Sequence, residues 1–263
     1  MTSTSKETQK KQSFQILSGS TLKIIAIILM VIDHIGAVVL YHGYLLPNAP
    51  IAPDSDVYKV YLFYNVLRFI GRSAFPIFCF LLVQGFIHTS NKGRFAIRLL
   101  IFAIISEVPF DIAIFDSWWD IAHQNIFFTL LIGFLVMWVW DIYKKKKDCS
   151  PDSSSEANMY LRDLPFQLLI LGLGMFLAHF LKTDYGYWGV LLIGVLYFFR
   201  SNSSLQALGG SLCLLWEAPA ILAFIPINMY NHQRGASLKY FFYLFYPAHL
   251  LILALIRYFV FRG

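Results

Sequence analysis

Two ionisable residues stand side by side inside the first long apolar stretch of the sequence. The segment LKIIAIILMVIDHIG places Asp33 and His34 about ten residues after Lys23, or about 15 Å along an α-helix. A carboxylate that orients an imidazole is the usual arrangement of a general base. We therefore take His34 as a candidate base, oriented by Asp33 or by a carboxylate on another helix. A packed, structural histidine is the alternative.

Two further pairs of charged residues are spaced four apart, so each pair shares one helix face. They are Arg68 with Arg72, and Glu107 with Asp111. In a structural interpretation, the arginines pair with these carboxylates and fix the register of the helices. In a functional interpretation, all four belong to the catalytic set with His34.

Other polar residues lie inside or at the ends of later apolar stretches. We expect five of them to contact substrate: Gln124, Asn125, Tyr185, Glu217 and His249. Charged groups in a bilayer normally face protein or a water-filled cavity. Their shared depth predicts a polar cavity in the middle to outer half of a membrane, open toward the outside.

The elements that position these residues are predicted to be membrane-spanning helices. The chain is 58% hydrophobic and 14% charged, where soluble domains are about 45–50% apolar and about 25% charged. A span needs about 20 mostly apolar residues. Eight stretches qualify, at about 22–41, 61–87, 95–115, 124–141, 164–181, 185–199, 204–227 and 239–261. The second contains Arg68, Arg72 and Pro76, which predicts a tilted or broken helix.

Positive charges indicate the orientation of these spans. Lysine and arginine gather in the N-terminal tail and in the second, fourth and sixth connections, which predicts eight spans with both termini in the cytoplasm. We expect an all-α polytopic bundle with a cytoplasmic tail at 1–21 and a single transmembrane domain at 22–263. The run KKKKDCSPDSSSE predicts a disordered cytoplasmic loop at about 142–163. Because the net charge of +6 lies in such loops, we expect no nucleic-acid partner, and the cysteine spacing indicates no metal site.

Several segments of the chain, in order, closely resemble the TraX family. They are LKIIAIILMVIDHIG, LRFIGRSAFPIFCFLLVQGF, RLLIFAIISEVPFDIA, QNIFFTLLIG, DYGYWGVLLIGVLY, YNHQRG and KYFFYLFYPAHLLIL. The resemblance covers almost the whole chain from Leu22 to Leu253. The N-terminal tail and the fourth loop carry none of these motifs.

The resemblance implies acyl transfer in a bacterial cytoplasmic (inner) membrane. The namesake of the family is required for acetylating the N-terminus of a pilin, and the wider superfamily contains type 3 membrane acyltransferases. That class carries a basic residue, ten intervening residues and a histidine in its first helix. Lys23 and His34 match this spacing. The implied partners are membrane lipids, cytoplasmic acetyl-CoA or another acyl-CoA as co-substrate, and an acceptor at the outer side of the membrane. This acceptor is a peptide N-terminus, a glycan or a cell-envelope polymer.

In the resulting hypothesis His34 removes a proton from the acceptor amine or hydroxyl, with an acyl-histidine intermediate as a variant. Four basic residues are candidates for binding the phosphates of coenzyme A: Lys23, Lys92, Arg94 and Arg98. Ordinary positive-inside charge is the other interpretation of these residues. Two further functions stay open. These are a proton-coupled transporter and a non-catalytic membrane scaffold. Intramembrane carboxylates and histidines also build proton relays, which is why a transporter is one of them.

Overall fold

Every regular element that the structure describes is a helix. The computed structural model describes residues 15–53, 55–148, 156–236 and 239–261. The predicted all-α class is confirmed for these residues. Most of the predicted N-terminal tail lies outside them.

The chain divides into two compact units. Unit 1 comprises Met1–Leu81, Ile105–Trp119 and Gly210–Gly263. Unit 2 comprises Leu82–Ile104 and Asp120–Gly209. The prediction of a single transmembrane domain at 22–263 stays a prediction.

The first helix of unit 1 changes type at His34. Helix α2 (Gly19–His34) passes directly into a π-helix, η1 (Ile35–Leu45). In a π-helix each N–H bonds to the carbonyl five residues earlier, as when Leu46 donates to Tyr41 at 2.8 Å. Because this turn is wider, the side chains that follow point in different directions from those of a continued α-helix. Because π segments occur frequently at functional sites, the position of the change draws attention to His34.

The start of α2 is held by a loop from the other end of unit 1. Backbone N–H groups in the first turn of a helix have no partner within the helix. The N–H of Gly19 donates to Gln233 at 2.8 Å and that of Ser20 to Arg234 at 3.0 Å. The Ser18 hydroxyl accepts from Thr21 as an N-cap. The YNHQRG segment therefore supplies carbonyls that complete the first helix.

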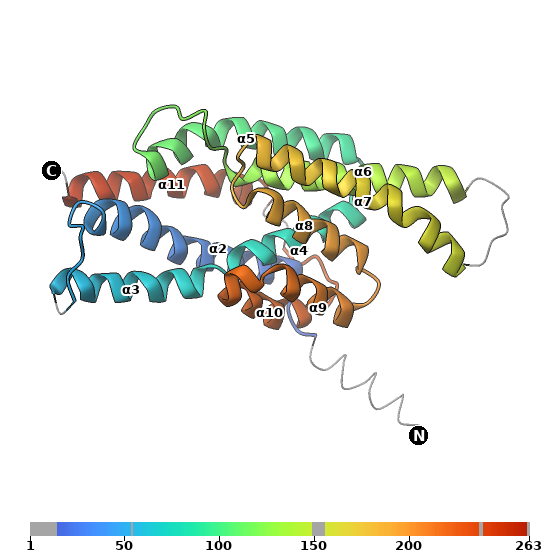
Figure 1. Ribbon diagram of the computed structural model, residues 1–263, viewed down its shortest axis with the longest axis horizontal. Coiled ribbons are helices and arrows are strands. Elements are labelled where there is room, and N and C mark those ends of the chain that lie inside the picture. Colours follow the sequence, from blue (N-terminus) through green and yellow to red (C-terminus); the bar gives the residue numbers. More distant parts are fainter. Residues whose placement is uncertain (1–14, 54, 149–155, 237–238, 262–263) are drawn as a thin grey trace, which may run out of the picture. The chain divides into compact units, whose positions relative to one another are not determined.

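The predicted break in the second apolar stretch is confirmed. Helix α3 (Asp56–Gly71) ends before Arg72, and α4 (Ala74–His88) begins two residues later. Within unit 1, α2 and α3 lie side by side (Figure 1). The break places Arg72 at the point where the chain leaves α3.

A glycine allows α2 and α3 to approach closely. A Cβ added to Gly71 would lie 2.6 Å from the Asp33 Cα and 2.7 Å from the Asp33 backbone nitrogen. Real Cβ atoms essentially never come that close to backbone, so only glycine fits this position. The close approach brings the end of α3 against Asp33.

Three short helices replace the predicted seventh span. They are α9 (Ser203–Cys213), the 3₁₀-helix η2 (Leu215–Ala223) and α10 (Phe224–Asn228). Glu217 interrupts η2 with a non-helical backbone at φ −133° and ψ 59°. The last predicted span is a single helix, α11 (Lys239–Phe261), which continues through Pro247 and packs along η1.

In unit 2, α6 (Ile126–Asp148), α7 (Glu156–Phe180) and α8 (Gly186–Phe198) pack against one another. Helices α7 and α8 form a hairpin, closed by backbone hydrogen bonds around Lys182 to Asp184. Because α6 and α7 reach Asp148 and Glu156, helix occupies much of the stretch predicted as a loop at about 142–163. The remainder of that stretch, 149–155, lies outside the described residues.

Five helices among the described residues are long and apolar enough to cross a membrane. The first, Gly19–Leu45, joins α2 to η1, and the second, Asp56–His88, joins α3 to α4 across the break. The other three are Ile126–Lys144, Asp163–Phe180 and Phe241–Phe261. Helix α8 and the segment Leu215–Asn228 are apolar but shorter. Helix α5 (Lys92–Phe115) is long enough but carries five charged residues. The chain is therefore a membrane protein with several candidate spans, and the count of eight and the cytoplasmic termini stay predictions.

We predict that Gly71→Ala destabilises the protein by about 1–3 kcal/mol, because the new methyl group overpacks the contact with Asp33. Thermal unfolding of purified protein in detergent, followed by tryptophan fluorescence, measures the change. Gly172→Ala on α7 is the matched control, because an added Cβ there meets nothing within 4 Å. A Gly71→Ala protein as stable as the Gly172→Ala protein would contradict the packing argument.

Candidate functional site

An ion pair joins the end of α2 to α3 in unit 1. Arg68 Nη1 donates to Asp33 Oδ2 and, at 3.4 Å, to the Asp33 carbonyl. The Asp33 residue is only 9% exposed. Burying a carboxylate is costly unless a cation and hydrogen bonds compensate it. Arg68 supplies both at this position.

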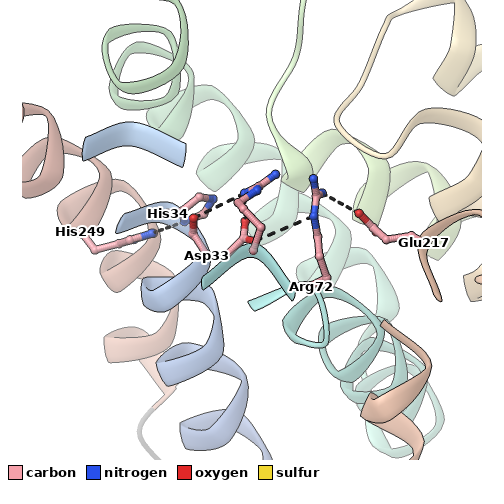
Figure 2. A network of polar contacts seen from close by, with 6 residues as sticks. Asp33, His34, Arg72, Glu217 and His249 are labelled. Carbon is pink, nitrogen blue, oxygen red and sulfur yellow. Dashed lines mark hydrogen bonds and ion pairs between the residues drawn. The ribbon is translucent and has the colours of Figure 1, made fainter. Parts of the chain in front are cut away.

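A second arginine connects α2 to η2. Arg72 Nη1 lies 2.7 Å from Glu217 Oε1, and Arg72 Nε lies 4.0 Å from Asp33 Oδ1. Figure 2 shows Arg72 between the two carboxylates. Ser73 beside it donates to the Pro219 carbonyl at 3.2 Å. The break after α3 and the irregular backbone of η2 therefore hold each other in place.

A pair of histidines lies on the other side of Asp33 (Figure 2). His34 Nδ1 and His249 Nε2 are 2.8 Å apart, which is a hydrogen-bond distance. The structure places His249, and not Asp33, at hydrogen-bond distance from His34 Nδ1, and an orienting role for a carboxylate stays a prediction. The physical reason for this placement is helix geometry. Adjacent side chains diverge by about 100°, so Asp33 faces the arginines of α3 while His34 faces α11.

Together these residues form a network that we call the α2–α11 cluster: Asp33, His34, Arg68, Arg72, Glu217 and His249. Two carboxylates balance two guanidinium groups, and two imidazoles adjoin them. Arg68 Nε is buried and has no hydrogen-bond partner among the described residues. The cluster can therefore offer an imidazole as a base and guanidinium N–H donors to a developing negative charge.

Glu107 and Asp111 lie in the part of α5 that belongs to unit 1. Their residues are buried, at 6% and 0% exposed. Their expected catalytic role stays a prediction. The carboxylates that the structure places against Arg68 and Arg72 to join the helices are those of Asp33 and Glu217.

Three of the residues predicted to bind substrate lie in unit 2. Asn125 Nδ2 donates to the Ala103 carbonyl at 2.7 Å, and Asn125 Oδ1 accepts from the N–H of Phe127 at 3.0 Å. Gln124 exchanges backbone hydrogen bonds with the turn that closes the α7–α8 hairpin. Tyr185 has φ +60° and directly precedes α8. These contacts shape the local fold, and a role in substrate binding stays a prediction.

Four basic residues were predicted to bind coenzyme A: Lys23, Lys92, Arg94 and Arg98. Lys23 belongs to unit 1 with its Nζ 5.3 Å from the centre of the Phe242 ring. In unit 2, Lys92 forms an ion pair with Asp141, and Arg94 is exposed. Their role toward the coenzyme stays a prediction.

Sequence reasoning missed two residues of unit 1 and the change of helix type. Tyr246 packs edge-on to His249 with ring centres 5.6 Å apart, and its spacing of three from His249 was an available signal. Arg257 is buried and donates to the carbonyls of Ile112 and Ala113 at 2.9 Å. The π-helix after His34 has no sequence signal that we recognise.

The fold and the cluster together define a helical membrane protein with a compensated charge network among its helices. A family model described as TraX protein matches residues 18–257. The chain therefore belongs to the TraX family. It is also 27% identical over 266 residues to the probable fimbrial assembly protein FimC, serogroup H1, of Dichelobacter nodosus, covering 90% of this chain and 94% of that protein. No solved structure matches the chain.

We predict strong coupling between Arg72 and Glu217. Arg72→Met leaves the Glu217 carboxylate, whose side chain is 9% exposed, without this cation and is expected to lower the free energy of unfolding by about 3–5 kcal/mol. Glu217→Leu leaves Arg72, whose side chain is 29% exposed and lies near Asp33, and is expected to cost less. The double variant is expected to lose less than the sum of the two single variants. Titration with a denaturing detergent measures all four proteins.

The control for this cycle lies on α3, the helix that ends just before Arg72. Asp56 and Lys59 form an ion pair on α3 with side chains 88% and 76% exposed, and such pairs contribute about 1 kcal/mol or less. Additive effects of Arg72→Met and Glu217→Leu, like those expected of the control pair, would contradict the coupling.

Proposed function

We propose that this protein is a membrane-embedded acyltransferase. It moves an acyl group, acetyl in the simplest case, from acyl-CoA to an acceptor amine or hydroxyl. The observation that carries the proposal is the position of His34 in the α2–α11 cluster. His249 engages one nitrogen of this imidazole, and Arg68, which pairs with the adjacent residue Asp33, has an unused N–H donor.

In the proposed reaction the acceptor nitrogen or oxygen attacks the thioester carbonyl, and His34 takes the proton that the acceptor loses. The bond between the acceptor and the carbonyl carbon forms while the carbonyl oxygen becomes an oxyanion. Guanidinium donors from Arg68 and Arg72 stabilise that charge. When the intermediate collapses, the carbon–sulfur bond breaks, and the departing coenzyme A thiolate takes the proton from His34.

Acyl-CoA is the proposed donor because of the first helix. Lys23 precedes His34 with ten residues between them, the spacing of the type 3 membrane acyltransferases that the chain resembles. On a helix this corresponds to about 16 Å. Lys23 is therefore proposed to bind a phosphate of the coenzyme while the thioester reaches His34, and the basic residues of α5 are further candidates.

The family and the fimbrial assembly relative support a role in the assembly of pili or fimbriae. The proposed location is the bacterial inner membrane. In that setting the proposed acceptor is a peptide N-terminus. A glycan and a cell-envelope polymer are the other acceptors that the same chemistry accommodates. Analysis of envelope fractions by mass spectrometry, with and without the protein, searches for the missing acyl mass.

A proton-coupled transporter is the second candidate, because the short contact between His34 and His249 can also pass a proton. The two functions differ in one property. An acyltransferase binds acyl-CoA and releases free coenzyme A, whereas a transporter has no need of either.

We predict that His34→Ala lowers acyl transfer by at least about 100-fold, since general-base catalysis typically contributes factors of about 10²–10⁴. Purified protein in liposomes, supplied with radiolabelled acetyl-CoA and an envelope extract, measures transfer of label and release of coenzyme A. His88→Ala is the control, because His88 is exposed at the end of α4. Undiminished transfer by the His34→Ala protein would exclude His34 from the chemistry.

A further inference from the structure

We infer that His249 is a positioning residue, which holds His34 in the tautomer with its proton on Nδ1 and leaves Nε2 as the basic nitrogen. The consequence for catalysis rests on the proposed acyl transfer. The tautomer itself follows from the geometry and can be tested without any substrate. Sequence reasoning had placed His249 among the substrate-binding residues, so this is a different role for it.

The first step concerns the outer nitrogen of the pair. His249 Nδ1 lies 2.9 Å from the carbonyl oxygen of Phe245, one turn earlier on α11. A carbonyl oxygen can only accept a hydrogen bond. His249 Nδ1 therefore carries a proton and donates it, whatever the state of the rest of the ring.

The second step concerns the charge on His249. The residue is only 5% exposed, and burying a cation without a counter-ion is costly. The two carboxylates of the cluster already face guanidinium groups, Asp33 with Arg68 and Glu217 with Arg72. Since His249 has no ion pair among the described residues, it is neutral, and its Nε2 carries a lone pair.

The third step transfers this constraint to His34. The contact of 2.8 Å between His34 Nδ1 and His249 Nε2 needs one donor. Because His249 Nε2 is the acceptor, His34 Nδ1 must donate. The carboxylates of Asp33 and Glu217 face guanidinium groups, and His34 has no ion pair in the described part of the chain, so its imidazole is neutral as well. In a neutral imidazole one nitrogen is a donor and the other an acceptor. His34 Nε2 is then unprotonated, as a general base requires.

The rings around His249 fix its orientation. The Phe245 ring stacks on the imidazole with centres 5.3 Å apart and planes within 9°, and Tyr246 packs against it edge-on. Turning the imidazole over would break both of its hydrogen bonds. The Phe245 carbonyl, a fixed backbone acceptor, therefore sets the tautomer of His249, and His249 in turn sets the tautomer of His34.

The direct test is magnetic resonance of the full-length protein in lipid bilayers, with ¹⁵N and ¹³C in all seven histidines. The His34 signals are assigned by comparison with a His34→Gln protein. A protonated Nδ1 and an unprotonated Nε2 on His34 are the expected result. A proton on His34 Nε2, alone or with one on Nδ1, would overturn the inference, whereas the proposed acyl transfer is tested separately by the His34→Ala protein.

Two variants test the consequence for turnover. A glutamine at position 249 places its side-chain oxygen near where His249 Nε2 lies in the parent protein. An asparagine there reaches only as far as His249 Nδ1. We expect His249→Gln to keep kcat within about tenfold of the parent, and His249→Asn to lose about 100-fold, as a wrong tautomer disables a catalytic histidine. KM is expected to change little in either variant.

These variants also separate positioning from mere structural support. If His249 only filled space, both substitutions would reduce stability and activity together, and the His34 tautomer would stay as in the parent. Equal activity of the His249→Asn and parent proteins would likewise refute the role. Loss of turnover in His34→Ala remains the test of the proposed function, so the two hypotheses fail separately.

Discussion

Two buried carboxylates and two guanidinium groups meet in unit 1 where α2, the end of α3 and η2 come together, and the rest of the site depends on their mutual compensation. Neither Asp33 nor Glu217 is tolerable in an apolar interior without a cation, and Arg68 and Arg72 supply one to each. Three features of the backbone serve this contact: the glycine that lets α3 approach α2, the break after Gly71, and the non-helical turn at Glu217. The histidine pair then lies beside a neutralised network rather than a charged one, and this is why a neutral imidazole is stable there.

The helical fold was largely predictable because apolar stretches of about 20 residues have few other uses. The break near Arg72 and the hairpin of α7 and α8 were also predictable, from polar residues within an apolar run and from a short link. The three-part form of the segment from Ser203 to Asn228 was not, because composition alone does not reveal where backbone must bend to bring Glu217 to an arginine. The π-helix was likewise invisible, since it depends on packing of η1 against α3 and α11.

For the site, the expected depth of each polar residue in the membrane was a better guide than the expected ion pairs. Residue type and position identified Asp33, His34, Arg68, Arg72, Glu217 and His249 as candidates, and the structure brings these six together. The partners were the part that sequence could not give. Asp33 turns to α3 and leaves His34 to α11, because one helix position separates their directions by about 100°. Gln124, Asn125 and Tyr185 look similar in sequence, yet each makes contacts that shape the local fold of unit 2.

The sequence separations within the cluster imply an order of assembly during synthesis. Asp33 and Arg68 are 35 residues apart, whereas His34 and His249 are separated by 215. With translation at about 5–20 residues per second, the first ion pair can form many seconds before the last helix leaves the ribosome. Charge is therefore neutralised early, while the nascent chain enters the bilayer, and the imidazole partner arrives last. A chain interrupted before α11 would contain the ion pair of Asp33 and Arg68 but not the histidine pair, so the α2–α11 cluster is complete only once the final helix is in place.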